Sequence, residues 1–190
     1  MDKTKLQDLA SASIDSNGCS SGRLNIHSLW TTECYDKDGN LKWVEKDRPN
    51  IVTDEGINAM LNIMFHGDAA KNPWYVAIFE SNSTPATSDT YDLWADSLVT
   101  ECNAAYDEET RPVYVEAAAT GKAITNSASK AVFTMNNNKT IYGAALVSNS
   151  TKGGHVAGDF LFCVSTFAVA RSVVNADILR VTIAIAGADS

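Results

Sequence analysis

The chain has 190 residues, of which 45% are hydrophobic and 20% are charged. This length suits one domain that buries about 70% of the surface of its unfolded chain. The composition excludes a disordered or fibrous protein. Acidic residues outnumber basic residues by 23 to 15, which gives a formal net charge of −8. Because this charge repels phosphate backbones and no basic run offsets it, we expect no nucleic-acid partner.

Residues 1–22 are polar and rich in serine. After Met1, their sizeable apolar residues are Leu6, Leu9 and Ile14, too few to hold a core. Two interpretations stay open: a frayed terminus, or an arm that becomes ordered against a neighbouring subunit. We therefore divide the chain into a flexible N-terminal arm over residues 1–22 and a single domain over residues 23–190.

The chain contains no apolar run of the roughly 18 to 20 residues needed to cross a bilayer. Its first five residues lead into no hydrophobic signal region. We therefore expect a protein that is synthesised in a cytoplasm and has no membrane partner.

A hairpin is predicted at the start of the domain. Residues 24–35 alternate loosely and are rich in strand formers, and residues 41–46 do the same. The turn between them contains Asp38-Gly39, which supplies the positive dihedral angle of a tight hairpin. This turn also resembles a calcium loop, but counted from Asp36 its glycine is fourth rather than sixth and its twelfth residue is aspartate. We therefore expect no calcium site there.

A helix is predicted after Thr53, whose side chain can cap the first turn, and before Gly67, which suits a left-handed stop. His66 falls in the last turn, where a cation suits the helix dipole. The spacing of the apolar residues places them on one helix face, which we expect to pack on the body of the protein. These residues are Ile57, Met60, Leu61, Met64 and Phe65. A strand is predicted next, over residues 74–79.

The rest of the chain predicts a long loop and a series of short strands. The loop covers residues 80–96, and we expect Tyr91, Leu93 and Trp94 to pin its far end to the body. The strands are predicted over residues 111–119, 131–135, 140–148, 159–169 and 178–186. The asparagines at 136–138 are interpreted as a hairpin tip. The predicted fold is mainly β, an antiparallel β-sandwich with one packed amphipathic helix.

The four cysteines are scattered and form no C-x-x-C pair, and no histidine lies at zinc-ligand spacing. We therefore expect no metal site and reduced thiols, with Cys163 acting as a small buried hydrophobe.

Catalytic motifs are also missing from the sequence. His27 lies in an alternating strand, and His155 lies in a glycine-rich turn, so structural or loop positions are favoured over catalysis. The sequence has neither a nucleophile elbow nor a phosphate-binding loop. We predict no catalytic residues, no cofactor and no enzymatic activity.

Four tryptophans raise the possibility of a binding surface, because exposed aromatic rings stack on sugars and anchor interfaces. Core packing is the favoured interpretation for all four. Trp74 and Trp94 flank the long loop, so these two are the candidates for contact with a partner.

Several segments resemble small structural proteins of tailed bacteriophages. The first is Asn50-Ile51-Val52-Thr53-Asp54-Glu55-Gly56-Ile57-Asn58-Ala59-Met60-Leu61, followed by Trp74-Tyr75-Val76-Ala77-Ile78-Phe79. Further segments are Asn126-Ser127 before Ala131-Val132-Phe133-Thr134, and Tyr142-Gly143-Ala144-Ala145-Leu146-Val147. The resemblance covers about residues 50–186.

This resemblance implies a virion component with a sandwich or jelly-roll-like body that works by binding. The favoured function is a capsid decoration (cement) protein, a homo-oligomer that binds the major capsid protein or other virion proteins across capsomer junctions. The alternatives are a tail-associated subunit (fibre, baseplate or adaptor) and a carbohydrate-binding module that uses Trp74 or Trp94. The candidate contact residues are Leu6, Leu9, Ile14, Trp74 and Trp94.

Overall fold

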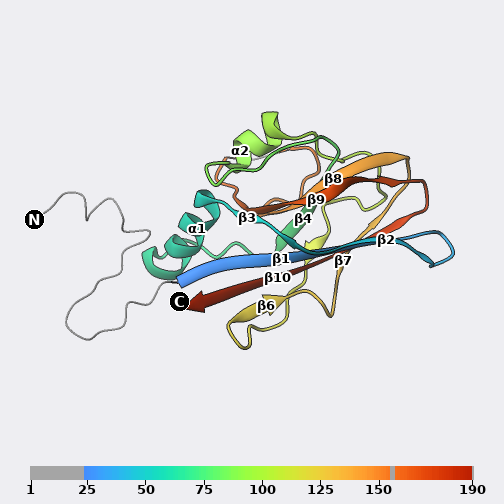
Figure 1. The fold of residues 1–190 in the computed structure, drawn as a ribbon. Helices are drawn as coiled ribbons and strands as arrows, with labels where there is room; N and C mark the ends of the chain where they lie inside the picture. The colour runs from blue at the N-terminus through green and yellow to red at the C-terminus, as the bar shows by residue number, and fades with distance from the viewer. Residues whose placement is uncertain (1–23, 155–156, 190) are drawn as a thin grey trace, which may run out of the picture.

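The computed structural model describes residues 24–154 and 157–189, which form two antiparallel sheets packed face to face (Figure 1). This architecture confirms the prediction of a mainly β antiparallel sandwich. The alternation of large apolar and polar residues along the long strands places one face of each sheet on a shared core.

The first sheet has the strand order β2-β1-β10, and two short strands pair with successive parts of the free edge of β10. Its members are β1 (Leu24–Tyr35), β2 (Leu41–Pro49), β6 (Ala123–Thr125), β7 (Ala131–Thr134) and β10 (Ile178–Asp189). The predicted hairpin of β1 and β2 is confirmed. Gly39 has a φ of 84° in its turn, where the Asp36 N–H donates to the Asn40 carbonyl at 2.9 Å.

The second sheet has the strand order β3-β9-β8-β4-β5. Its members are β3 (Ile51–Val52), β4 (Trp74–Phe79), β5 (Val113–Tyr114), β8 (Lys139–Val147) and β9 (Leu161–Val173). The predicted strand over residues 111–119 is reduced to two residues in β5.

The asparagine tip at residues 136–138 is not a hairpin, which corrects the sequence-based interpretation. The strand before the tip, β7, pairs with β10 in the first sheet, whereas β8 pairs with β9 and β4 in the second. The turn therefore crosses between the sheets. Its backbone is held by other loops, since the Met135 N–H donates to the Asp177 carbonyl at 2.8 Å and the Asn136 N–H donates to the Ala105 carbonyl at 3.0 Å.

The main core lies between the two sheets, and a second cluster lies on the outer face of the second sheet. Buried residues of the main core include Trp30, Ile78, Phe133, Ile141 and Leu179. The second cluster joins Phe79, Val147 and Leu161 to the long loop between β4 and β5. Figure 1 shows the short helix α2 (Tyr91–Leu93) above this sheet, where the π-helical turn η3 (Trp94–Leu98) continues it.

The long loop is thus pinned as predicted through Tyr91 and Trp94, both of which are buried. The same prediction is wrong for Leu93, which is exposed. Residues 80–96 therefore cover the sheet rather than projecting freely from it. In the part of the chain that the structure describes, no helix is both long enough and apolar enough to span a membrane.

Candidate functional site

The predicted helix is present and has the predicted ends. It consists of α1 (Asp54–Leu61) and the π-helical turn η2 (Asn62–His66). The Thr53 hydroxyl accepts a hydrogen bond from the Gly56 N–H at 2.9 Å, which satisfies a free amide of the first turn. The helix ends at Gly67, whose φ of 85° is the left-handed conformation that favours glycine.

The helix packs most closely through small residues, and of the predicted apolar face only Ile57 and Met60 are half-buried. Gly56 and Ala59 are the buried residues of α1. A Cβ atom on Gly56 would lie 2.6 Å from the carbonyl oxygen of Phe162 in β9, so only glycine permits this close approach. The helix backbone is thereby drawn onto the sheet, and part of the large apolar face remains outside.

Three large apolar side chains form an exposed surface on this helix, which we call the α1 patch. The exposed fractions are 42% for Leu61, 68% for Met64 and 82% for Phe65. The prediction that these residues pack on the body is therefore wrong. Clustered exposed apolar side chains of this size are typical of interaction surfaces.

An apolar cavity of about 420 Å³, which we call the end groove, lies beside the α1 patch. The helix contributes Met60, Ile63 and Met64 to its lining. The second sheet contributes Trp74 and Phe162, among others, and the first sheet contributes Ile124 and Ile185. The groove therefore opens at one end of the sandwich, where the two sheets are not packed directly together.

Trp74 and Trp94, the predicted contact residues, lie on opposite faces of the second sheet. Trp74 is partly buried in the wall of the end groove and packs edge-on against Phe162, with ring centroids 5.7 Å apart. Trp94 is 1% exposed and stacks on Tyr91 on the outer face. A side chain so deeply buried offers no face to a ligand, so Trp94 has the core position that the sequence favoured. Leu6, Leu9 and Ile14 lie outside the described residues.

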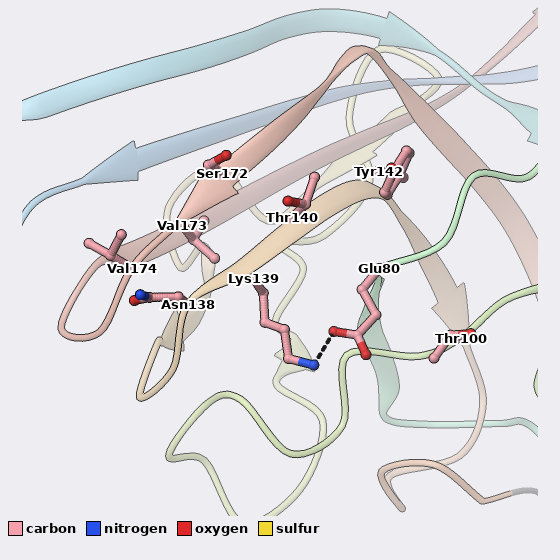
Figure 2. Close-up of a pocket in the computed structure, with 9 residues that line it drawn as sticks. All are labelled: Glu80, Thr100, Asn138, Lys139, Thr140, Tyr142, Ser172, Val173 and Val174. Atoms are coloured by element: carbon pink, nitrogen blue, oxygen red, sulfur yellow. Dashed lines mark ion pairs between the residues drawn. The ribbon is translucent and has the colours of Figure 1, made fainter.

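A second cavity, of about 640 Å³, is polar and lies where β4 ends and β8 begins, beside the end of β9. Figure 2 shows Lys139 and Glu80 pointing toward one another in it, and their charged atoms are 2.6 Å apart. The hydrogen bond from Lys139 to Glu80 raises the pKa of the lysine. These two residues are the charged members of the lining and neutralise each other. The cavity therefore presents hydroxyl and amide groups but no unpaired charge.

The histidines and acidic side chains of the described ranges 24–154 and 157–189 include no cluster of three or more metal-ligating groups. His27 is exposed on β1, His66 is exposed at the end of η2, and His155 lies outside the described residues. In the turn that resembles a calcium loop, the Asp36 carboxylate accepts hydrogen bonds from the Asn40 side chain and backbone. These bonds lower the pKa of Asp36, and they engage the carboxylate in the turn itself.

Three cysteines act as core residues. Cys34, Cys102 and Cys163 are buried free thiols, which confirms the prediction for Cys163. Burial raises the pKa of each thiol to about 12, with a further contribution from the charge of Asp177 at Cys34. These thiols stay protonated at neutral pH and are poor nucleophiles.

The end groove was not predicted, because its wall comes from the helix and from strands of both sheets, which the sequence does not place together. One local feature of the sequence could have indicated how closely the helix packs beside this groove. Gly56 and Ala59 lie three residues apart on the helix face opposite part of the apolar stripe, and such small residues permit close packing. No protein-family model matches this chain, and no curated protein matches it either.

Proposed function

We propose that the protein is a non-enzymatic structural subunit of a bacteriophage virion, most specifically a capsid decoration (cement) protein. It binds across capsomer junctions and stabilises the shell. The proposal combines the resemblance of residues 50–61 and 74–79 to phage structural proteins with one structural observation. That observation is the exposed α1 patch beside the apolar end groove.

The α1 patch supports a binding function because water-exposed apolar side chains gain free energy when a partner covers them. Full burial of a side chain such as Phe65 or Met64 contributes about 1.5 to 3 kcal/mol. Each such contact is modest, but a subunit attached at several equivalent positions adds them together. Aromatic and methionine side chains are enriched at protein interfaces, as Phe65 and Met64 would be here.

The charge of the chain supports a place on the outside of the shell. A net charge of −8 is repelled by packaged nucleic acid but leaves apolar contacts with protein unaffected. Partners are therefore the major capsid protein, other virion proteins and further copies of this chain.

The first test is the copy number of the protein in purified particles. A decoration protein is expected at on the order of hundreds of copies per virion, since it follows the symmetry of the shell. A dozen copies or fewer would contradict decoration and would favour the alternative of a tail-associated subunit, which could use the same α1 patch.

The second test is attachment of the purified protein to particles that lack it. Phe65→Ser is expected to weaken attachment by about tenfold or more, because the variant loses the largest exposed apolar side chain. Val169→Ser is the matched control, since Val169 is an exposed apolar residue of β9. If Phe65→Ser and Val169→Ser attached equally well, the α1 patch would not be the surface that binds the particle. Deletion of residues 1–22 is expected to abolish attachment and preserve the fold if that segment forms an arm.

A carbohydrate-binding module remains the alternative outside the virion class. The burial of Trp94 leaves Trp74 as the candidate platform for a sugar ring. Glycan-array binding that disappears in the Trp74→Ala variant would favour this alternative over the structural subunit.

A further inference from the structure

The end groove leaves the sandwich unfilled at one end. Ile124 and Ile185 of the first sheet line one side of it, and Leu146 and Phe162 of the second sheet line another. Protein interiors have few voids larger than a water molecule. An apolar space of about 420 Å³ instead lies within the range of roughly 300 to 1,000 Å³ that proteins fill with a ligand.

The described chain begins near this groove, on the strand next to its Ile185 wall. Ser28 in β1 pairs with Ile185, so Leu24 lies four residues beyond the groove wall, a distance of about 13 Å along the strand. Leu24 shares the strand face of the buried Ser28 and Trp30, yet 70% of it is exposed. Figure 1 shows the start of β1 at the end of the sandwich that carries α1.

We infer that the end groove is the docking site of the protein's own N-terminal segment, with Leu6, Leu9 and Ile14 as the side chains that fill it. This inference goes beyond the proposed function, because it concerns the free protein and needs no particle. It gives the three apolar residues of an otherwise polar segment a defined partner.

The length of the segment permits this contact. Nine residues lie between Ile14 and Leu24, and the ten steps from one to the other reach about 33 to 36 Å when extended, well over the distance to the groove wall. Residues 16–22 contain two glycines, an asparagine and three serines. These residue types form turns, so the chain can reverse direction before it enters β1.

The charge of the segment also fits the groove. Residues 1–23 carry three basic and three acidic side chains, so their formal charge is zero and the net charge of −8 belongs to the rest of the chain. Docking therefore meets no net repulsion from the acidic body. The groove offers mostly apolar side chains, which suit two leucines and an isoleucine.

The groove is filled by the segment of the same chain rather than by that of a second copy, because the tethered segment has the higher effective concentration at the groove. A connection of nine residues, 15–23, keeps the segment near the groove at about millimolar effective concentration. A second copy at micromolar concentration competes poorly with a segment tethered so close to its site.

Methionine methyl groups provide a direct test in the full-length protein. The chain has four methionines, and two of them, Met60 and Met64, line the end groove, whereas Met135 is buried in the main core. We would record methyl resonances of protein labelled at methionine and assign them with Met60→Leu and Met64→Leu. The combined substitution Leu6→Ser, Leu9→Ser and Ile14→Ser is expected to shift the Met60 and Met64 resonances and leave Met135 in place. Gln7→Ser is the matched control and is expected to shift none of the three.

Two results would overturn the inference. The first is unchanged Met60 and Met64 resonances in the triple variant while Met135 reports an intact core. The second is a wild-type spectrum that changes to that of the triple variant on dilution by about tenfold, since that would identify a second copy as the occupant. Neither result depends on particle attachment, so failure of this inference and failure of the proposed function are distinguishable.

Discussion

Arg111 and Glu101 form a bidentate ion pair in the interior of the protein. The Arg111 Nε donates to Glu101 Oε1 at 2.8 Å, and Nη2 donates to Oε2 at 2.7 Å. The Arg111 Nη1 also donates to the Tyr91 hydroxyl at 2.7 Å and to the Asn149 carbonyl at 2.9 Å. Burial lowers the pKa of Arg111, but the hydrogen bonds and charge of Glu101 more than offset this, so the pKa is raised. The pair joins distant parts of the connection between β4 and β5 to the loop between β8 and β9.

Glu101→Gln is expected to lower the free energy of unfolding by about 3 to 5 kcal/mol, because it leaves the Arg111 guanidinium buried without its counter-charge. Urea unfolding followed by tryptophan fluorescence measures this change. Lys37→Ala is the control, since the Lys37–Asp38 pair is exposed and contributes at most about 1 kcal/mol. If the free energy of unfolding fell by a similar amount in the two variants, the structural role of the buried pair would be contradicted.

Gly56→Ala is expected to destabilise the protein by about 1 to 3 kcal/mol, because the new methyl group would meet the Phe162 backbone. Helix propensity alone predicts the opposite, a gain of about 1 kcal/mol. Asn58→Ala, at an exposed position of the same helix, is the control and is expected to be neutral or stabilising. A more stable Gly56→Ala protein would show that α1 does not pack this closely on β9.

Phe65→Ala is expected to change the free energy of unfolding by less than about 0.5 kcal/mol, because its ring lies outside the core. Phe133→Ala, by contrast, is expected to cost about 3 to 5 kcal/mol, since that ring is fully buried between the sheets. The two values from chemical denaturation test the assignment of Phe65 to the α1 patch. A large decrease in the free energy of unfolding for Phe65→Ala would show that its side chain packs in the core rather than on a binding surface.

The protein is expected to lose stability in alkaline solution. Burial raises the pKa of the thiols of Cys34, Cys102 and Cys163 from 9.0 to about 12. Between these values the unfolded chain binds fewer protons than the folded one. The free energy of unfolding therefore falls as the pH rises, by about 1.4 kcal/mol per pH unit for each thiol. Below pH 9.0 the contribution is fully present. Burial also raises the pKa of Tyr114, which acts in the same direction.

Urea midpoints at about pH 8 and about pH 10 measure this loss. Cys102→Ala is the informative variant, because it removes one buried thiol. It is expected to reduce the difference between the two midpoints, since any destabilisation by the smaller side chain lowers both midpoints alike. Equal midpoints for the wild-type protein at the two pH values would contradict the burial of these thiols.

The features that the sequence predicted correctly depend on neighbouring residues. The Asp38-Gly39 turn, the Thr53 cap and the Gly67 stop are local, and each controls the backbone within a few residues. The alternation along β1 and β10 likewise identifies a half-buried strand without reference to its partner.

Strand pairing could not be predicted in the same way. The segments on either side of residues 136–138 both look like ordinary strands, but they belong to different sheets. A strand's hydrogen-bonding groups are the same whichever partner it has, so the choice depends on how the two sheets fill their common core.

The amino-acid sequence by itself determined that this protein is an acidic, mainly β sandwich with a well-capped helix after Thr53, since caps, turns and alternation act at short range; the short helix α2, inside the predicted loop, was missed. Only the tertiary structure decided which face of that helix is free. Gly56 draws the helix onto β9 and leaves Leu61, Met64 and Phe65 in solvent, because a contact with a distant backbone outweighs the pattern of large apolar residues. The same packing puts Met60, Ile63 and Met64 in the wall of the end groove, and it thereby places the candidate binding surface beside α1.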